Sequence, residues 1–189
     1  MTSNFPPALI LILGALLVPF FRGKAKNWYV ILLPAAAFYL ITQLETGSSW
    51  QIHFFGFDLT FLRVDKLSKV FGYIFTMNAV AAFVYAFYLK DNTQHMAALF
   101  YIGSSLGVVF AGDLLTLFLF WEAMALASTT VILAAGTRRA RRAAMRYLLV
   151  HLTGGVLLLC GIVLRMAGPE GLAFGPIGLG GPGSWLIFL

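Results

Sequence analysis

The sequence has few charged residues and almost no cysteine. Only 11% of its 189 residues are Asp, Glu, Lys or Arg, and Cys160 is the single cysteine. A soluble domain of this size needs more charged groups to cover its surface. One cysteine excludes an internal disulfide, and we expect Cys160 to be a small packed residue. The sequence also lacks a phosphate loop, a dinucleotide fingerprint, a haem site and a Cys/His ligand cluster, so we predict no cofactor or metal.

Long apolar runs are what the sequence does contain. Hydrophobic residues make up 60% of the chain, and the mean hydropathy is +0.89. Runs near the ~20 residues that cross a bilayer core must be helical, since lipid offers the backbone no hydrogen bonds. We therefore predict an all-α, polytopic transmembrane protein with a single domain over residues 1–189. The predicted spans are 6–21, 27–44, 67–89, 95–112, 114–135 and 143–165, and a seventh begins near Trp185.

The basic residues predict the orientation. No positive side chain precedes the first span, which is the reverse of a signal peptide, so this span should stay with its N-terminus outside. Nine Lys and Arg residues then fall on the inner side and four on the outer side. Because these residues lie in short connections between spans, the net charge of +6 indicates membrane topology and contact with lipid, and does not indicate nucleic-acid binding.

Two connections are longer than a turn. Residues 45–66 alternate polar and apolar side chains around Gly56, which predicts a short hairpin on the outer surface, with an irregular amphiphilic loop as the alternative. The connection over 168–183 is rich in glycine and proline and should be coil. His53 and His95 are expected at the surfaces, exposed to solvent.

Glu122 is the main candidate functional residue. It lies near the middle of the fifth predicted span, where an ionised acid costs about 2.5–3.5 kcal/mol, so such residues are usually functional. Desolvation raises the pKa of a carboxyl and a nearby cation lowers it, so an acid held between the two can bind and release a proton. The alternative is a structural carboxyl that is hydrogen-bonded to a neighbouring helix.

His151 is the second ionisable residue inside a predicted span. Histidine titrates near physiological pH and suits a proton relay with Glu122, although a neutral histidine bonded to a carbonyl is the alternative. Arg146, on the same span, could bias Glu122 electrostatically as well as anchor the helix. The hydroxyls of Ser128, Thr129 and Thr130 could line a proton path or simply allow close helix packing.

Four ordered blocks resemble the N-terminal part of the antiporter-like membrane subunits of respiratory complex I, membrane-bound hydrogenases and Mrp-type Na+/H+ antiporters. Residues 64–71 resemble the family's V-D-x-L-S-x-x-F run, and Asp113–Leu115, Phe120–Met124 and Ala143–Leu149 follow at similar spacing. The likeness covers about residues 58–165. Residues 151–155 look most like the D-type branch of the Mrp antiporters or the hydrogenase branch.

The resemblance implies a proton- or cation-translocating subunit of a multisubunit complex in a bacterial or archaeal inner membrane. In that family the fifth-span Glu pairs with a Lys on the seventh span, and Glu122 would take the Glu role, with Arg146 at a basic sixth-span position. The sequence ends at Leu189, before such a Lys. We therefore expect other membrane subunits as partners, and either a sequence cut short or a separate polypeptide that supplies the remaining half.

Two other functions stay open. The chain could be a non-transporting scaffold that anchors a soluble redox module, with Glu122 merely structural. It could also be an independent small channel, although the end at Leu189, about one turn into a span, weakens that reading.

Overall fold

The computed structural model describes residues 5–47, 49–54, 56–167, 171, 172, 174 and 187. Six α-helices and one hairpin form this part of the chain. Their bounds are α1 Pro7–Leu17, α2 Gly23–Gln43, β1 Ser49–Phe54, β2 Phe57–Arg63, α3 Lys66–Tyr85, α4 Asn92–Phe110, α5 Leu114–Leu133 and α6 Arg138–Met166. Short 3₁₀ turns extend α1 and α3 over Val18–Phe20 and Ala86–Tyr88. Apart from residues 171, 172, 174 and 187, the coil predicted over 168–183 and the seventh span predicted from Trp185 lie outside the described residues.

Polar side chains fix where most of the later helices begin. Asp65 and Ser68 form a reciprocal capping box at the start of α3. Asp91, Asp113 and Thr137 each accept a backbone N–H from the first turn of α4, α5 and α6. The cap at Thr137 explains why α6 starts five residues before the predicted span, because the arginine-rich run continues the helix beyond its apolar part.

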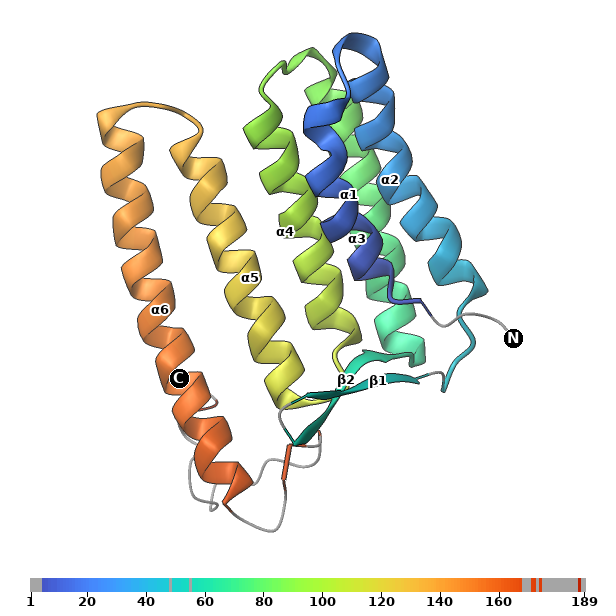
Figure 1. The fold of residues 1–189 in the computed structure, drawn as a ribbon, viewed down its shortest axis with the longest axis vertical. Coiled ribbons are helices and arrows are strands. Elements are labelled where there is room, and N and C mark those ends of the chain that lie inside the picture. Colours follow the sequence, from blue (N-terminus) through green and yellow to red (C-terminus); the bar gives the residue numbers. More distant parts are fainter. Residues whose placement is uncertain are drawn as a thin grey trace.

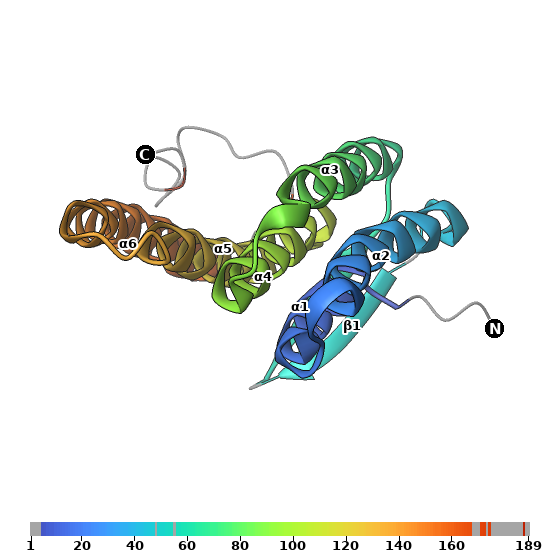
Figure 2. The same cartoon turned by 90° about the horizontal axis from the view of Figure 1, so that it is seen from above.

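The six helices lie side by side with the hairpin across one end (Figure 1). The α1–α2, α3–α4 and α5–α6 turns all lie at the opposite end, which we call the basic end. Seen from above, α1 to α4 form a cluster from which α5 and α6 extend as an arm (Figure 2). The arm joins the cluster where α5 packs against α4, and α6 packs against the other side of the arm's α5. The basic end carries Arg22, Lys24, Lys26, Lys90, Arg138, Arg139, Arg141 and Arg142.

An antiparallel hairpin occupies the stretch where the alternation predicts one. β1 pairs with β2, and Gly56 at the turn has φ +82°, a conformation that glycine adopts without strain. The Gly112 N–H donates to Thr60 O over 2.9 Å, which ties the hairpin to the link between α4 and α5. The start of α5 is thus fixed to the hairpin.

Glycines let α4 approach its neighbours closely. A Cβ at Gly103 would lie 3.1 Å from Ala8 O on α1, and a Cβ at Gly107 would overlap the Phe120 ring on α5. The spacing Gly103-x-x-x-Gly107 is typical of close helix contacts in membranes. α4 therefore holds the α1–α4 cluster and the arm together.

Three of the described helices are long and apolar enough to cross a membrane, namely Lys66–Tyr88, α5 and α6. Pro7–Phe20 is apolar but shorter. Their outward faces carry many exposed apolar side chains, such as Leu149, Val150 and Val156 on α6. This is the surface of a multi-pass membrane protein.

The structure corrects two residue-level predictions. His95 is only 2% exposed, not solvated, because it lies one turn inside α4, bonds through Nδ1 to Asp91 O over 2.7 Å and stacks on Phe83. Cys160 was expected to pack internally but is exposed on α6, a helix that packs mainly through its α5-facing side. His53 is exposed as predicted, and pairs with Asp58.

Candidate functional site

The carboxyl of Glu122 lies between α5 and α6. Glu122 is the ninth residue of α5, about 12 Å along the helix from Leu114. Its side chain is half-buried, and Oε1 is fully buried with no hydrogen-bond partner among the described residues. A buried acid oxygen without a partner is costly, so this position is a strong candidate for binding a proton or an ion.

Gly155 of α6 makes room for this carboxyl. Gly155 is buried, and a Cβ built on it would overlap Glu122 Oε1 and lie 2.9 Å from the Glu122 Cδ carbon. At the neighbouring Gly154 a Cβ would meet no described atom within 4 Å. The two glycines therefore differ: Gly155 accommodates the Glu122 carboxyl, whereas Gly154 faces open space.

His151 lies one helical turn from Gly155, about 6 Å along the axis of α6. Its ring is flanked by Trp121 of α5, at a centroid distance of 5.6 Å, and by Tyr147, at 5.8 Å. His151 Nε2 is buried and has no hydrogen-bond partner in the described part of the chain. The structure therefore brings the two predicted ionisable residues to one interface, each with an unpaired buried atom.

A hydrogen bond joins the two helices on the far side of His151 from Gly155. Tyr147 OH donates to Ser128 Oγ over 3.1 Å, and Ser128 Oγ donates to Met124 O over 2.6 Å. Thr129 and Thr130 instead donate to carbonyls four residues earlier on α5. Of the three predicted path-lining hydroxyls, Ser128 is the one with a recorded bond to α6.

Ser128 and Tyr147 also line a pocket between α4, α5 and α6. The pocket has a volume of about 410 Å³ and is lined further by Ala98, Tyr101, Ile102, Val131 and Ile132. Most of the lining is apolar, and its hydroxyls are those of Ser128, Tyr147 and Tyr101, which are the groups that could hold water there. The polar groups of the interface thus run from this pocket past His151 to Glu122.

Arg146 is exposed, immediately before Tyr147 on α6. No hydrogen bond or ion pair joins it to Glu122 within the described ranges. Nor does any group of three or more His, Cys, Asp or Glu gather there as a metal site.

The sequence indicates that Gly154 and Gly155 either loosen α6 or let another helix pack closely, but it predicts neither the contact of Gly155 with the Glu122 carboxyl nor the roles of Trp121 and Tyr147. Tyr147, His151 and Gly155 follow one another at intervals of four residues, so they share one face of α6. That spacing is visible in the sequence. The spacing does not reveal which helix this face contacts. Only the packing of α6 on α5 shows that the face meets Glu122.

The sequence of this chain is similar to those of membrane subunits from one group of proteins. Residues 111–182 match the family described as NADH:quinone oxidoreductase/Mrp antiporter, transmembrane. The chain is 30% identical over 179 residues to the A-type subunit of the Na+/H+ antiporter of Alkalihalophilus pseudofirmus, covering 86% of this chain and 22% of that protein. It is 28% identical over 175 residues to the A1-type subunit of the Na+/H+ antiporter of Staphylococcus aureus, covering 84% and 22%.

Solved structures show the same fold. A chain of the Mrp complex from Dietzia sp. aligns with TM-score 0.81 and 22% identity over 88% of this chain and 20% of its own. A chain of the archaeal membrane-bound sulfane sulfur reductase aligns with TM-score 0.78 and 24% identity over 91% and 29%. Respiratory complex I from Thermus thermophilus gives TM-score 0.75 and 18% identity over 96% and 41%.

The chain spans about a fifth of the length of these curated relatives. Both relatives are of the A type, so the resemblance of residues 151–155 to the D-type branch does not identify the branch of this chain.

Proposed function

Because this chain is an antiporter-like membrane subunit, homologous to the A-type subunits of Mrp Na+/H+ antiporters and to complex I membrane subunits, we propose that it translocates protons or cations with Glu122 as the carrier. The observation that carries the proposal is the buried Oε1 of Glu122 at the α5–α6 interface, which has no hydrogen-bond partner among the described residues. A charged carboxylate left without a partner there is destabilised, so binding a proton or cation relieves the cost.

His151 is the proposed relay to Glu122. Its Nε2, which has no partner in the part of the chain that the structure describes, lies on the same interface, one turn of α6 from the glycine that contacts the Glu122 carboxyl. One or two waters between the residues would carry a proton, since an imidazole can accept it on one nitrogen and release it from the other. The pocket beside Ser128 and Tyr147 would supply these waters.

Arg146 and the hydroxyls of Thr129 and Thr130 have smaller proposed roles. Arg146 is exposed in this chain. Its charge would affect Glu122 only if further polypeptide of the complete unit covers α6. The threonine hydroxyls are held by carbonyls of α5 and would contribute to a path only by also accepting a water proton.

The proposed setting is a bacterial or archaeal cell membrane, as for the homologues. We infer six spans with the N-terminus outside, because the turns and helix ends at the basic end carry eight cations and one acid, Asp91. Other membrane subunits are the proposed partners, since the relatives and structural neighbours include the Mrp complex, the sulfane sulfur reductase and complex I. Further polypeptide, in this chain or a separate one, would complete the unit.

Replacing Glu122 tests the proposal in the complete complex. In inverted membrane vesicles, Glu122→Gln should reduce cation-dependent proton movement, followed with a pH-sensitive dye, by at least about tenfold, because an amide cannot exchange the proton. Glu45→Gln is the matched control, since Glu45 is exposed and outside the site. The control should keep full activity.

The same experiment distinguishes transport from the scaffold alternative. The amount of assembled complex is measured for each variant, so that loss of assembly is separated from loss of translocation. A Glu122→Gln complex that assembles and keeps ion-coupled activity would show that Glu122 is structural and would favour the scaffold role.

A further inference from the structure

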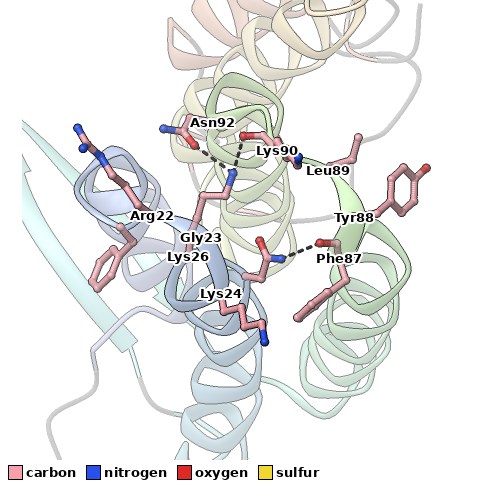
Figure 3. Close-up of a pocket in the computed structure, with 11 residues that line it drawn as sticks. Arg22, Gly23, Lys24, Lys26, Phe87, Tyr88, Leu89, Lys90 and Asn92 are labelled. Carbon is pink, nitrogen blue, oxygen red and sulfur yellow. Dashed lines mark hydrogen bonds between the residues drawn. The ribbon is translucent and has the colours of Figure 1, made fainter.

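A second polar site lies at the basic end, remote from Glu122. It is a pocket of about 610 Å³ between the start of α2 and the turn that links α3 to α4 (Figure 3). Its lining divides into cations, aromatic and apolar residues, and small polar residues: Phe21, Arg22, Gly23, Lys24, Lys26, Asn27, Phe87, Tyr88, Leu89, Lys90 and Asn92. The proposed transport function assigns no role to this pocket.

The charge of the pocket is of one sign. Arg22, Lys24, Lys26 and Lys90 line it, and no Asp or Glu is among the lining residues. Asp91 lies beside it in the sequence, but its carboxylate accepts the Thr93 N–H at the start of α4. Four cations around one hollow therefore repel one another, and an anion bound between them would offset that repulsion.

Lys26 gives the strongest indication of an anion. It is only 4% exposed, and its Nζ donates to Lys90 O over 2.7 Å and to Asn92 Oδ1 over 3.1 Å (Figure 3). Both acceptors are neutral, and no carboxylate pairs with Lys26 in the described part of the chain. A buried ammonium is normally paired with an anion, and Lys26 has a third N–H to offer.

We propose that this pocket binds the phosphate headgroup of an anionic membrane phospholipid. The phosphate would accept hydrogen bonds from Lys26 and from the exposed Arg22 and Lys24. The start of α2 adds free backbone N–H groups, because Arg22 at its N-cap position makes no side-chain cap.

The surroundings favour a lipid over a free anion. Phe87 and Tyr88 line the pocket and are 40% and 70% exposed, and Trp28 contacts Phe87 edge-on at 6.2 Å. Asn27 donates to Phe87 O over 2.7 Å and so fixes the aromatic turn beside the cations. Aromatic side chains next to cations at a helix end are typical of the membrane interface, where an acyl chain can lie on the rings while the headgroup meets the charges.

Charge removal at exposed positions tests the site without disturbing Lys26, which ties α2 to the α3–α4 turn. The purified chain in detergent is titrated with phosphatidylglycerol and with phosphatidylcholine, and bound lipid is counted by native mass spectrometry. The wild type should prefer phosphatidylglycerol. Arg22→Gln/Lys24→Gln should weaken phosphatidylglycerol binding about tenfold and leave phosphatidylcholine binding unchanged.

Arg138→Gln/Arg139→Gln is the matched control, because it removes the same charge at the basic end but outside the pocket. It should change phosphatidylglycerol binding less than about twofold.

Equal weakening of phosphatidylglycerol binding by both double variants would overturn the proposal, because it would show diffuse attraction of the lipid to the basic end. Inorganic phosphate that displaces phosphatidylglycerol at equal concentration would identify a free-anion site instead. Full phosphatidylglycerol binding by Arg22→Gln/Lys24→Gln would also overturn it, because the lipid would then bind without the cations of the pocket.

Discussion

At the scale of single residues, the position of Glu122 depends on glycine, which has no side chain, at position 155 across the interface. The Glu122 carboxyl occupies the space where a Cβ of residue 155 would be, and Oε1 is buried there without a partner among the described residues. Glycine at 155 is therefore a steric requirement of the site. An acid in the middle of an apolar helix is visible in the sequence, whereas the glycine that accommodates it is found only when α6 is placed against α5.

Gly155→Ala should displace the Glu122 carboxyl. The new methyl group would overlap Oε1, so either the acid changes rotamer or α6 moves away, at a cost of about 1–3 kcal/mol. We expect at least a tenfold loss of cation-dependent proton movement in vesicles, measured per assembled complex.

Gly154→Ala is the matched control for this change. A Cβ at Gly154 meets no described atom within 4 Å, and alanine favours the helix by up to about 1 kcal/mol. Similar activities for the two alanine variants would show that contact with Gly155 does not position Glu122.

At the scale of elements, Asp113 connects the hairpin to the helix that carries Glu122. Its carboxylate is 4% exposed and accepts three hydrogen bonds: from the Thr116 N–H, from the Thr116 hydroxyl and from the Thr60 N–H of β2. An acid directly before a predicted helix, as at Asp113, is typical of a helix cap. The sequence does not reveal the bond to Thr60, because that bond depends on the hairpin folding back beneath α5.

Asp113→Ala should lower the free energy of unfolding by about 2–4 kcal/mol. The variant loses a helix cap, worth about 1 kcal/mol, and leaves the Thr60 N–H without its acceptor, at about 1–3 kcal/mol. Thermal unfolding of the purified protein in detergent, followed by tryptophan fluorescence, measures the change.

Asp91→Ala is the corresponding control at the start of α4. Asp91 is exposed and accepts one backbone N–H, from Thr93, so only the cap contribution is lost. Equal destabilisation by the two variants would mean that the bond from Asp113 to the hairpin contributes nothing to stability.

At the scale of the whole molecule, charge and helix order together predict the orientation. The α1–α2, α3–α4 and α5–α6 turns share the basic end, and the hairpin lies at the other end (Figure 1). Labelling of single cysteines tests which end is cytoplasmic, after Cys160→Ser removes the exposed native thiol. Lys24→Cys and Arg138→Cys should react with an impermeant maleimide in inverted vesicles, and His53→Cys in intact cells.

Labelling of Lys24→Cys from outside would invert the predicted orientation. Labelling of positions 24 and 138 from opposite sides would instead contradict the six-span arrangement, because both positions belong to the basic end of the bundle.

The sequence by itself determined the helices, the caps at Asp65 and Asp113, the hairpin and the membrane character, because hydropathy and capping act over neighbouring residues. It also singled out Glu122 and His151, since ionisable side chains in an apolar run are rare. Only the tertiary structure decided which helices are neighbours. That pairing buries His95, seats Glu122 against Gly155, joins Tyr147 to Ser128 and gathers four cations around one pocket. The contacts of Glu122 with Gly155, of Tyr147 with Ser128 and of Lys26 with Lys90 join residues far apart in the chain, so their energies depend on packing that no local pattern encodes.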